Sequence, residues 1–337
     1  MQYICKKNFH MKVLGLGNAL TDVLATLPTD GEISRTGLLK GGMQLIDEQK
    51  LAELTALFKG YDTVLAPGGS AANTLTGITR MGLPAGFIGK IGRDECGRFY
   101  REALEQAGVE SRLLEGDLPS GRAMTLVSPD GERTFGTYLG AAASLTAAEL
   151  RPEMFGGYDL LHIEGYLVQD PDLIRTAVCM ARNAGLRISL DLASYNVVEA
   201  HRDFFGELIR DYVDIVFANE EEALAYTGKV PAEAVRVLSE ACDIAVVKCG
   251  ADGSLVRQGK RQIRIEAIPA RCIDTTGAGD LYAAGFLYAL AHGCSLKTAG
   301  KTGSVLSGNV IEIVGTCMDS SRWERIKNDV RLLFRAD

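Results

Sequence analysis

The stretch at residues 274–280, DTTGAGD, sets Gly-Ala-Gly between two carboxylates and runs directly into the apolar sequence LYAAGFLYALA. A turn needs one glycine, and a helix cap needs one Asp or Thr. Glycines let the backbone approach a ligand closely, and a helix N-terminus offers unpaired N–H groups and the positive end of a dipole. The spacing therefore predicts an anion site at Gly277, Ala278 and Gly279, where a buried helix begins near Asp280.

Asp280 follows the predicted anion site directly, where its carboxylate could accept a proton from an attacking hydroxyl. Repulsion by a bound phosphate would raise the pKa of this carboxylate toward the range that suits a general base. The arrangement favours phosphoryl transfer, with the backbone amides holding the developing charge. The alternative is an ordinary helix N-terminus capped by Thr276 or Asp274, which leaves both glycines unexplained.

Apolar runs alternate with helical patterns after residue 150, at 158–165, 186–194, 213–220 and 243–250. This alternation predicts right-handed crossovers and a parallel sheet. Each run carries a polar residue at or near its end, and ligands of open α/β sheets bind outside the carboxyl ends of the strands. For any one of these residues, capping of a neighbouring helix is an equally good interpretation. The four residues are Glu164, Asp191, Asn219 and Lys248.

A second group of strands is predicted in the first half of the chain. Residues 122–139 alternate around a Pro-Asp-Gly turn at 129–131, and no helical pattern precedes residue 45. A small sheet that covers the ligand-binding edge would act as a lid. We expect a single large domain, 1–337, with a lid built from about residues 20–45 and 112–142.

The composition excludes several classes of function. The chain has 337 residues with a net charge of −7, so it lacks the basic footprint of a nucleic-acid-binding protein. No apolar run is long enough to span a bilayer. The eight cysteines include no C-x-x-C pair and indicate a reducing, cytoplasmic location. Residues 1–10 precede the first predicted strand as an extension, and Met11 could be an alternative start.

Two common nucleotide-binding motifs have no complete match in the chain. The chain lacks G-x-x-x-x-G-K-[ST], so it is not a P-loop enzyme. The sequence GLGNAL at 15–20 begins like the dinucleotide motif G-x-G-x-x-G but has Leu20 in place of the third glycine. An NAD-dependent oxidoreductase is therefore only a remote alternative.

Five separate motifs resemble the signatures of the ribokinase-like (PfkB) family of carbohydrate and nucleoside kinases. They lie in family order across nearly the whole chain. The resemblance implies an α/β three-layer sandwich with a mostly parallel central sheet, helices on both faces and a small β-sheet lid. It also implies a kinase that uses ATP and Mg²⁺, with K⁺ as a further candidate. The motifs lie at residues 66–82, 87–109, 219–228, 246–256 and 274–280.

The resemblance implies a role for each matching residue. Asp280 would be the catalytic base for a primary hydroxyl, and Gly277, Ala278 and Gly279 would form the anion hole. Glu222 would organise magnesium through water. The residues expected to bind the acceptor are Asn18, Asp22, Gly68, Gly69, Asn73, Arg133, Tyr138, Glu164 and Tyr166. Those expected to bind the nucleotide are Asn219, Lys248, Gly250, Gly253 and Thr275.

Several of these residues have simpler interpretations. Asn18 and the glycine pair could belong only to turns, and Glu222 could lie on a solvated helix face. Arg133 could be a surface residue of the lid hairpin. Tyr138 and Tyr166 could stack on a base, but they could also pack in a core.

The acceptor is predicted from departures within the family pattern. Ser70 follows the glycine pair where ribose kinases often have Lys, which favours the nucleoside branch. Tyr282 replaces the Phe usually found two residues after the base. We expect a small-molecule acceptor, with adenosine converted to AMP as the best single prediction. A ribokinase- or fructokinase-type sugar kinase is the alternative, and pairing of lid strands between subunits would make a homodimer.

Overall fold

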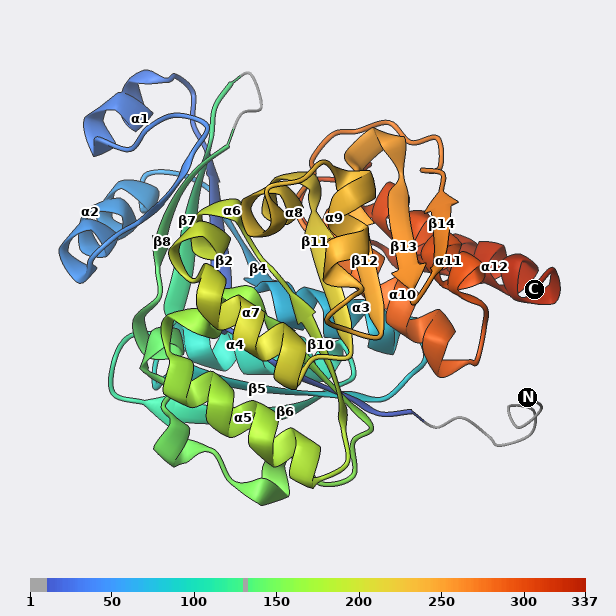
Figure 1. Cartoon of the computed structure of the whole chain (residues 1–337). Coiled ribbons are helices and arrows are strands. Elements are labelled where there is room, and N and C mark those ends of the chain that lie inside the picture. The colour runs from blue at the N-terminus through green and yellow to red at the C-terminus, as the bar shows by residue number, and fades with distance from the viewer. Residues whose placement is uncertain (1–10, 130–132) are drawn as a thin grey trace.

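The computed structural model describes residues 11–129 and 133–337 (Figure 1). The predicted extension at 1–10 and the tip of the predicted hairpin turn lie outside the described residues. The main body is a nine-stranded sheet in the order β14-β13-β12-β11-β10-β9-β1-β5-β6. Its strands are β1 (Val13–Leu16), β5 (Ala85–Gly92), β6 (Val109–Gly116), β9 (Leu160–Glu164), β10 (Arg187–Asp191), β11 (Ile215–Asn219), β12 (Ile244–Lys248), β13 (Ser254–Gln258) and β14 (Arg261–Ile265).

The strands of this sheet are parallel from β12 to β6, and β13 and β14 continue the sheet as antiparallel strands. Successive side chains of a strand point to opposite faces, so a strand covered on both faces must be apolar throughout. In β1, Val13 packs into one core cluster while Leu14 and Leu16 pack into the other. The same division separates Val246 from Val247 in β12.

Helices cover both faces, so the body has three layers, as predicted (Figure 1). Each face has its own apolar core, and α10 packs between α3 and α11. One core includes α3 (Ser70–Met81), α4 (Glu95–Gln106), α10 (Ala278–Ala291), α11 (Leu296–Val310) and α12 (Ser320–Arg335). The other includes α5 (Pro171–Asn183), α6 (Tyr195–Ala200), α7 (Arg202–Asp211), α8 (Glu220–Thr227) and α9 (Pro231–Leu238). Short 3₁₀ helices lie at Gly140–Ser144, Ala147–Glu149, Pro152–Met154, Gly165–Gln169 and Gly250–Asp252.

A second sheet of five strands, in the order β3-β8-β7-β2-β4, forms a separate layer with two helices. One of its faces packs on α1 and α2 through an apolar cluster that includes Leu54, Phe58 and Leu126. Its strands are β2 (Leu20–Thr26), β3 (Met43–Leu45), β4 (Thr63–Gly68), β7 (Gly121–Val127) and β8 (Arg133–Tyr138). The helices are α1 (Gly31–Thr36) and α2 (Glu48–Phe58).

The small sheet differs from its predicted boundaries at three places. Residues 109–116 form β6, an edge strand of the large sheet, so residues 112–116 of the predicted lid segment belong to the main body. The chain at 63–68 forms β4, whose largely exposed residues give no alternating pattern. A helix, α1, precedes residue 45, but only Ile33 and Thr36 of its six residues are buried. So short an element has no detectable periodicity.

The four runs predicted after residue 150 are present as adjacent parallel strands, β9 to β12. They end at Glu164, Asp191, Asn219 and Lys248, and the register places Asp191 beside Glu164 and Lys248 beside Asn219. All four side chains therefore reach one edge of the sheet. Within residues 11–129 and 133–337, no helix has both the length and the apolar character needed to cross a membrane.

Candidate active site

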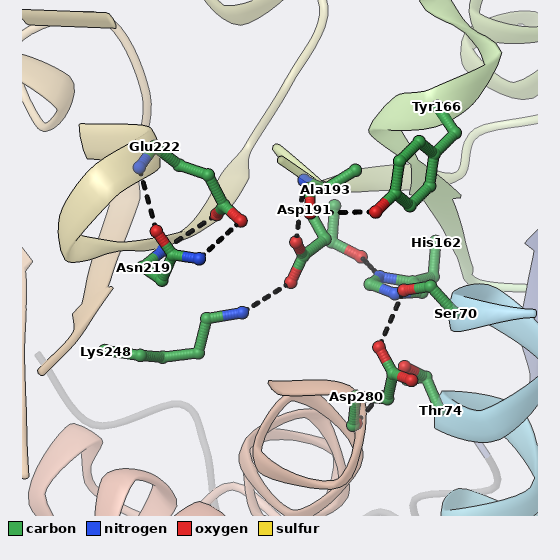
Figure 2. A network of polar contacts seen from close by, with 11 residues as sticks. Ser70, Thr74, His162, Tyr166, Asp191, Ala193, Asn219, Glu222, Lys248 and Asp280 are labelled. Atoms are coloured by element: carbon green, nitrogen blue, oxygen red, sulfur yellow. Dashed lines mark hydrogen bonds and ion pairs between the residues drawn. The ribbon is translucent and has the colours of Figure 1, made fainter. Parts of the chain in front are cut away.

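A cavity of about 1010 Å³ opens at this edge, between the strand ends and the start of α10. Asp191, Asn219 and Lys248 line it from the sheet, and Gly279 and Asp280 line it from the helix. Figure 2 shows Asp280 and the Asp191–Lys248 pair in the same network of polar contacts. A volume of this size accommodates a ligand larger than a simple sugar.

Asp280 is the third residue of α10, which begins at Ala278, two residues earlier than the sequence indicates. Its carboxylate accepts a hydrogen bond at Oδ1 from the Ser70 hydroxyl (2.7 Å) and at Oδ2 from Asn73 Nδ2 (2.9 Å). Both donors belong to the first turn of α3. Burial raises the pKa of Asp280 to about 6, although the bonds from Ser70 and Asn73 lower it. A carboxylate with that pKa is unprotonated at neutral pH and basic enough to take a proton.

The Gly-Ala-Gly stretch has the close packing that its composition indicates. Gly277 has φ +73°, and no side chain in the described structure caps the helix there, so the simple capping alternative is wrong. A methyl group at Gly279 would lie 2.9 Å from Lys248 Nζ. The amide of Ala278, by contrast, already donates to the Thr275 carbonyl (3.1 Å), so it is not free for an anion.

The sheet edge holds two further carboxylates. Lys248 Nζ lies 2.7 Å from Asp191 Oδ2, and both side chains are largely buried. Glu222 is 2% exposed and exchanges hydrogen bonds with Asn219 as a capping box at the start of α8. It therefore does not lie on a solvated face, unlike Glu220 and Glu221. Burial, followed by repulsion from Asp191, raises the pKa of Glu222 to about 7.

All five predicted nucleotide-binding residues line the same cavity. Gly250, Gly253 and Thr275 lie on its wall together with Asn219, Lys248 and Glu222. Within the described residues, no three His, Cys, Asp or Glu side chains are grouped closely enough to hold a metal by themselves. A magnesium ion here would need oxygens from water and the nucleotide.

Glu164 supports the site by holding the start of α3. Its carboxylate accepts hydrogen bonds from Asn18 N (2.8 Å), Asn18 Nδ2 (2.7 Å) and Ala71 N (3.1 Å). It is 1% exposed, and burial raises its pKa to about 7. Because Ala71 lies in the first turn of α3, Glu164 fixes the helix that presents Ser70 and Asn73 to Asp280. Its contacts are therefore with protein groups, although the sequence predicts contact with the acceptor.

Asp22 and the glycine pair lie close together on the side of the small sheet. A methyl group at Gly68 would lie 2.7 Å from Asp22 Oδ1, so the carboxylate rests on the backbone there. Gly69 precedes α3 with φ +93° and provides the turn into the helix. Burial raises the pKa of Asp22 to about 7, and Arg133 opposes that shift.

Arg133 connects the small sheet with the loop before α10. Its Nη1 lies 2.8 Å from Asp274 Oδ2, and the two side chains are 12% and 10% exposed. The interpretation of Arg133 as a surface hairpin residue is therefore wrong. Asp274 also accepts hydrogen bonds from the backbone amides of Thr276 and Gly315, so the pair holds this loop in place.

The two predicted stacking tyrosines lie in different surroundings. Tyr166 lines the cavity and donates a hydrogen bond to the carbonyl of Ala193 (3.3 Å). Tyr138 is buried in the apolar cluster between the small sheet and its helices, which is the packing alternative.

Three residues of this site were missed as functional partners. Ser70 contacts Asp280, and its spacing of three from Asn73 places both on one helix face, which is a signal that the sequence carries. Asp191 was identified only as a strand-end residue. The sequence indicates Asp274 only as a possible cap, and nothing in it predicts the pairing with Arg133, which lies 141 positions earlier.

The sequence and the fold are similar to those of known proteins. The sequence model described as pfkB family carbohydrate kinase matches residues 42–323. A nucleoside kinase of Methanothermobacter thermautotrophicus is 30% identical over 253 residues, which cover 74% of this chain and 79% of the relative.

Two solved structures are similar over nearly the whole chain. An adenosine kinase from Sinorhizobium meliloti is 34% identical with a TM-score of 0.84 and covers 95% of this chain and 99% of its own. A probable sugar kinase from Rhizobium etli is 32% identical with a TM-score of 0.85 and covers 95% and 98%.

Proposed function

The chain belongs to the pfkB family of carbohydrate kinases, and we propose that it transfers the γ-phosphoryl group of ATP to the 5′-hydroxyl of adenosine, giving AMP and ADP. It is a phosphotransferase of the nucleoside and sugar kinase type with an alcohol group as acceptor. The observation that carries the proposal is the Asp280 carboxylate, held by two neutral donors beside the start of α10.

The chemistry follows from the placement of Asp280. The acceptor hydroxyl gives its proton to the carboxylate as its oxygen attacks the γ-phosphorus, and the bond to the β–γ bridging oxygen breaks. Negative charge then spreads over the transferred phosphoryl oxygens. The Lys248 ammonium beside the start of α10, together with the positive end of that helix dipole, would stabilise that charge.

Magnesium fits the donor groups of the cavity. Glu222 provides a buried carboxylate on the wall, and oxygen donors are what this ion prefers. Glu222 already accepts two hydrogen bonds from Asn219, so it would orient water of the ion. The ion would supply charge neutralisation for the nucleotide phosphates.

Adenosine is favoured by two observations. The Sinorhizobium meliloti structure named an adenosine kinase is 34% identical to this chain. The Ser70 hydroxyl donates a hydrogen bond to Asp280, and ribose kinases often have Lys at the position of Ser70. A sugar acceptor is the second candidate, because the Rhizobium etli structure named a probable sugar kinase is similarly close.

An oxidoreductase that binds NAD through the first strand has no support. A methyl group at Gly17 would lie 2.5 Å from Glu164 Oε2, so a protein carboxylate occupies the space next to this glycine. A pyrophosphate could not be placed against it without repulsion.

The proposal is tested with a panel of acceptors and ATP. We expect AMP formation from adenosine with a higher kcat/KM than the phosphorylation of ribose, fructose or other nucleosides. Preference for a sugar would overturn the acceptor assignment. Absence of phosphoryl transfer to every acceptor would overturn the proposed function.

A further inference from the structure

Lys248 is expected to stabilise the transferred phosphoryl group, but that expectation does not say what its buried partner Asp191 does. Nζ of Lys248 lies 2.7 Å from Asp191 Oδ2, with the side chains 14% and 7% exposed. Both residues line the cavity, Asp191 at the end of β10 and Lys248 at the end of β12, and β11 lies between these strands. The Lys248 side chain therefore reaches past one strand to meet this carboxylate (Figure 2). A buried ion pair contributes little to stability by itself, so a functional role is a better explanation for this pair on the cavity wall.

The carboxylate of Asp191 is itself fixed by an unusual backbone. Asp191 Oδ1 accepts a hydrogen bond from the amide of Ala193 (3.1 Å), and the hydroxyl of Tyr166 donates to the Ala193 carbonyl (3.3 Å). Ala193 has φ +70°, and it is the one non-glycine residue with positive φ in the described ranges. Strained backbone of this kind persists where surrounding contacts hold it, and it is concentrated at functional sites.

The ammonium of Lys248 is directed at the start of α10. A methyl group on Gly279 would lie 2.9 Å from Nζ, so only glycine leaves room for the ammonium there. Burial lowers the pKa of Lys248, but Asp191 and Glu222 raise it by more, so the ammonium stays charged. One carboxylate thus holds a positive charge beside the helix terminus that is expected to receive a phosphoryl group.

We propose that Lys248 contacts the transferred phosphoryl group and that Asp191 is the positioning residue that holds its ammonium against Gly279. The inference rests on the proposed function, since it concerns the same phosphoryl transfer. Asp191 is not a second base, because its charge is already paired. Its contribution passes through Lys248, and the turn at Ala193 keeps its carboxylate in place.

A double-mutant cycle tests this dependence. Lys248→Met is expected to lower kcat about 100-fold, as the loss of a preorganised charge-stabilising donor does, with the KM of the acceptor unchanged. Asp191→Asn is expected to lower kcat about 10-fold, within the range of coupling between contacting residues. The double variant should be no slower than Lys248→Met alone, because Asp191 acts only through the ammonium.

Two variants control for folding. Lys248→Met leaves a buried carboxylate unpaired and is expected to lower the melting temperature, whereas the double variant removes both charges and should restore part of that loss. Lys248→Arg keeps the charge and should retain more activity than Lys248→Met. The exposed pair of Arg175 and Glu207, at 2.8 Å, is the matched control, and Arg175→Met with Glu207→Gln should leave kcat unchanged.

The same cycle is measured on ATP affinity by isothermal titration, which needs no acceptor. If the cycle measured on ATP affinity is non-additive but the wild-type protein does not phosphorylate adenosine, the acceptor assignment is wrong and the inference stands. Effects of the two substitutions that multiply in kcat and in ATP affinity would overturn the inference. Wild-type kcat in Lys248→Met would overturn it as well.

Discussion

Two carboxylates of the cavity, Asp280 and Asp191, are held in contrasting ways. Asp280 at the start of α10 has neutral donors, Ser70 and Asn73, and burial brings its pKa to about 6. Asp191 at the end of β10 faces the Lys248 ammonium at 2.7 Å. Asp280 has a raised pKa and can accept a proton, whereas Asp191 is engaged in an ion pair with Lys248. The contrast assigns proton transfer to the helix side and charge placement to the sheet side.

The largest expected effect comes from removing the base on the helix side. Asp280→Asn should lower kcat by about 10³- to 10⁴-fold, since general base catalysis contributes at most about that much. The asparagine keeps the shape of the side chain, so the Kd of the acceptor should remain close to that of the wild type. Steady-state kinetics and calorimetry measure the two quantities.

The control for this variant is Asp117→Asn, because the Asp117 side chain is 94% exposed and pairs with Arg93 on the surface. It should leave kcat unchanged. Turnover at the wild-type rate in Asp280→Asn would remove the base from the account.

A smaller effect is expected from loosening the base without removing it. Ser70→Ala deletes the hydrogen bond to Asp280 Oδ1 and should lower kcat roughly 10-fold, because a bond to a charged group contributes about 1.5–3 kcal/mol. Ser321→Ala, on an exposed helix start, is the matched control. A Ser70→Ala enzyme with unchanged kcat and an unchanged pH profile would show that the contact is only structural.

The smallest effects separate backbone strain from side-chain contact at Ala193. Ala193→Gly should change the free energy of unfolding by less than about 1 kcal/mol, because glycine adopts φ +70° freely but loses more entropy on folding. Ala193→Val should destabilise the protein and lower kcat, since a β-branched residue is strained there. Urea denaturation measures the free energy of unfolding of both variants. Equal stability of the two variants would mean that the turn does not hold Asp191.

The sheet side of the site was more predictable than the small sheet. Runs of apolar residues that end in Glu164, Asp191, Asn219 and Lys248 identify parallel strands and their common edge, because a buried strand needs continuous apolar sequence. The glycines of 274–280 predict a close approach of the backbone to a ligand, and in the structure a methyl group on Gly279 would lie against Lys248.

The contacts between distant segments could not be predicted. Whether Lys248 meets Asp191 or a ligand depends on the spacing of three strands, and the pairing of Arg133 with Asp274 depends on how the small sheet meets the large one. The contacts of Glu164 could not be predicted for the same reason, since its partners Asn18 and Ala71 come from other parts of the chain. Tertiary packing decides these partners, and residue type alone cannot.

The pH dependence of kcat/KM tests the contrast most directly. Asp280 must be unprotonated to act, so kcat/KM should fall as the pH drops below about 6. Lys248 lowers the pKa of Asp280 and Asp191 raises it, so the acidic limb should move to higher pH in Lys248→Met and to lower pH in Asp191→Asn.

The pKa of Glu222 depends on the same two charges, and Glu164 also has a pKa of about 7. The pH profiles of Glu222→Gln and Glu164→Gln are therefore measured as controls. Both variants should still lose kcat/KM on the acidic side, as the wild type does. The account predicts opposite shifts in the Lys248 and Asp191 variants. A profile that is flat between pH 5 and 8, or one that moves in the same direction in both variants, would contradict it.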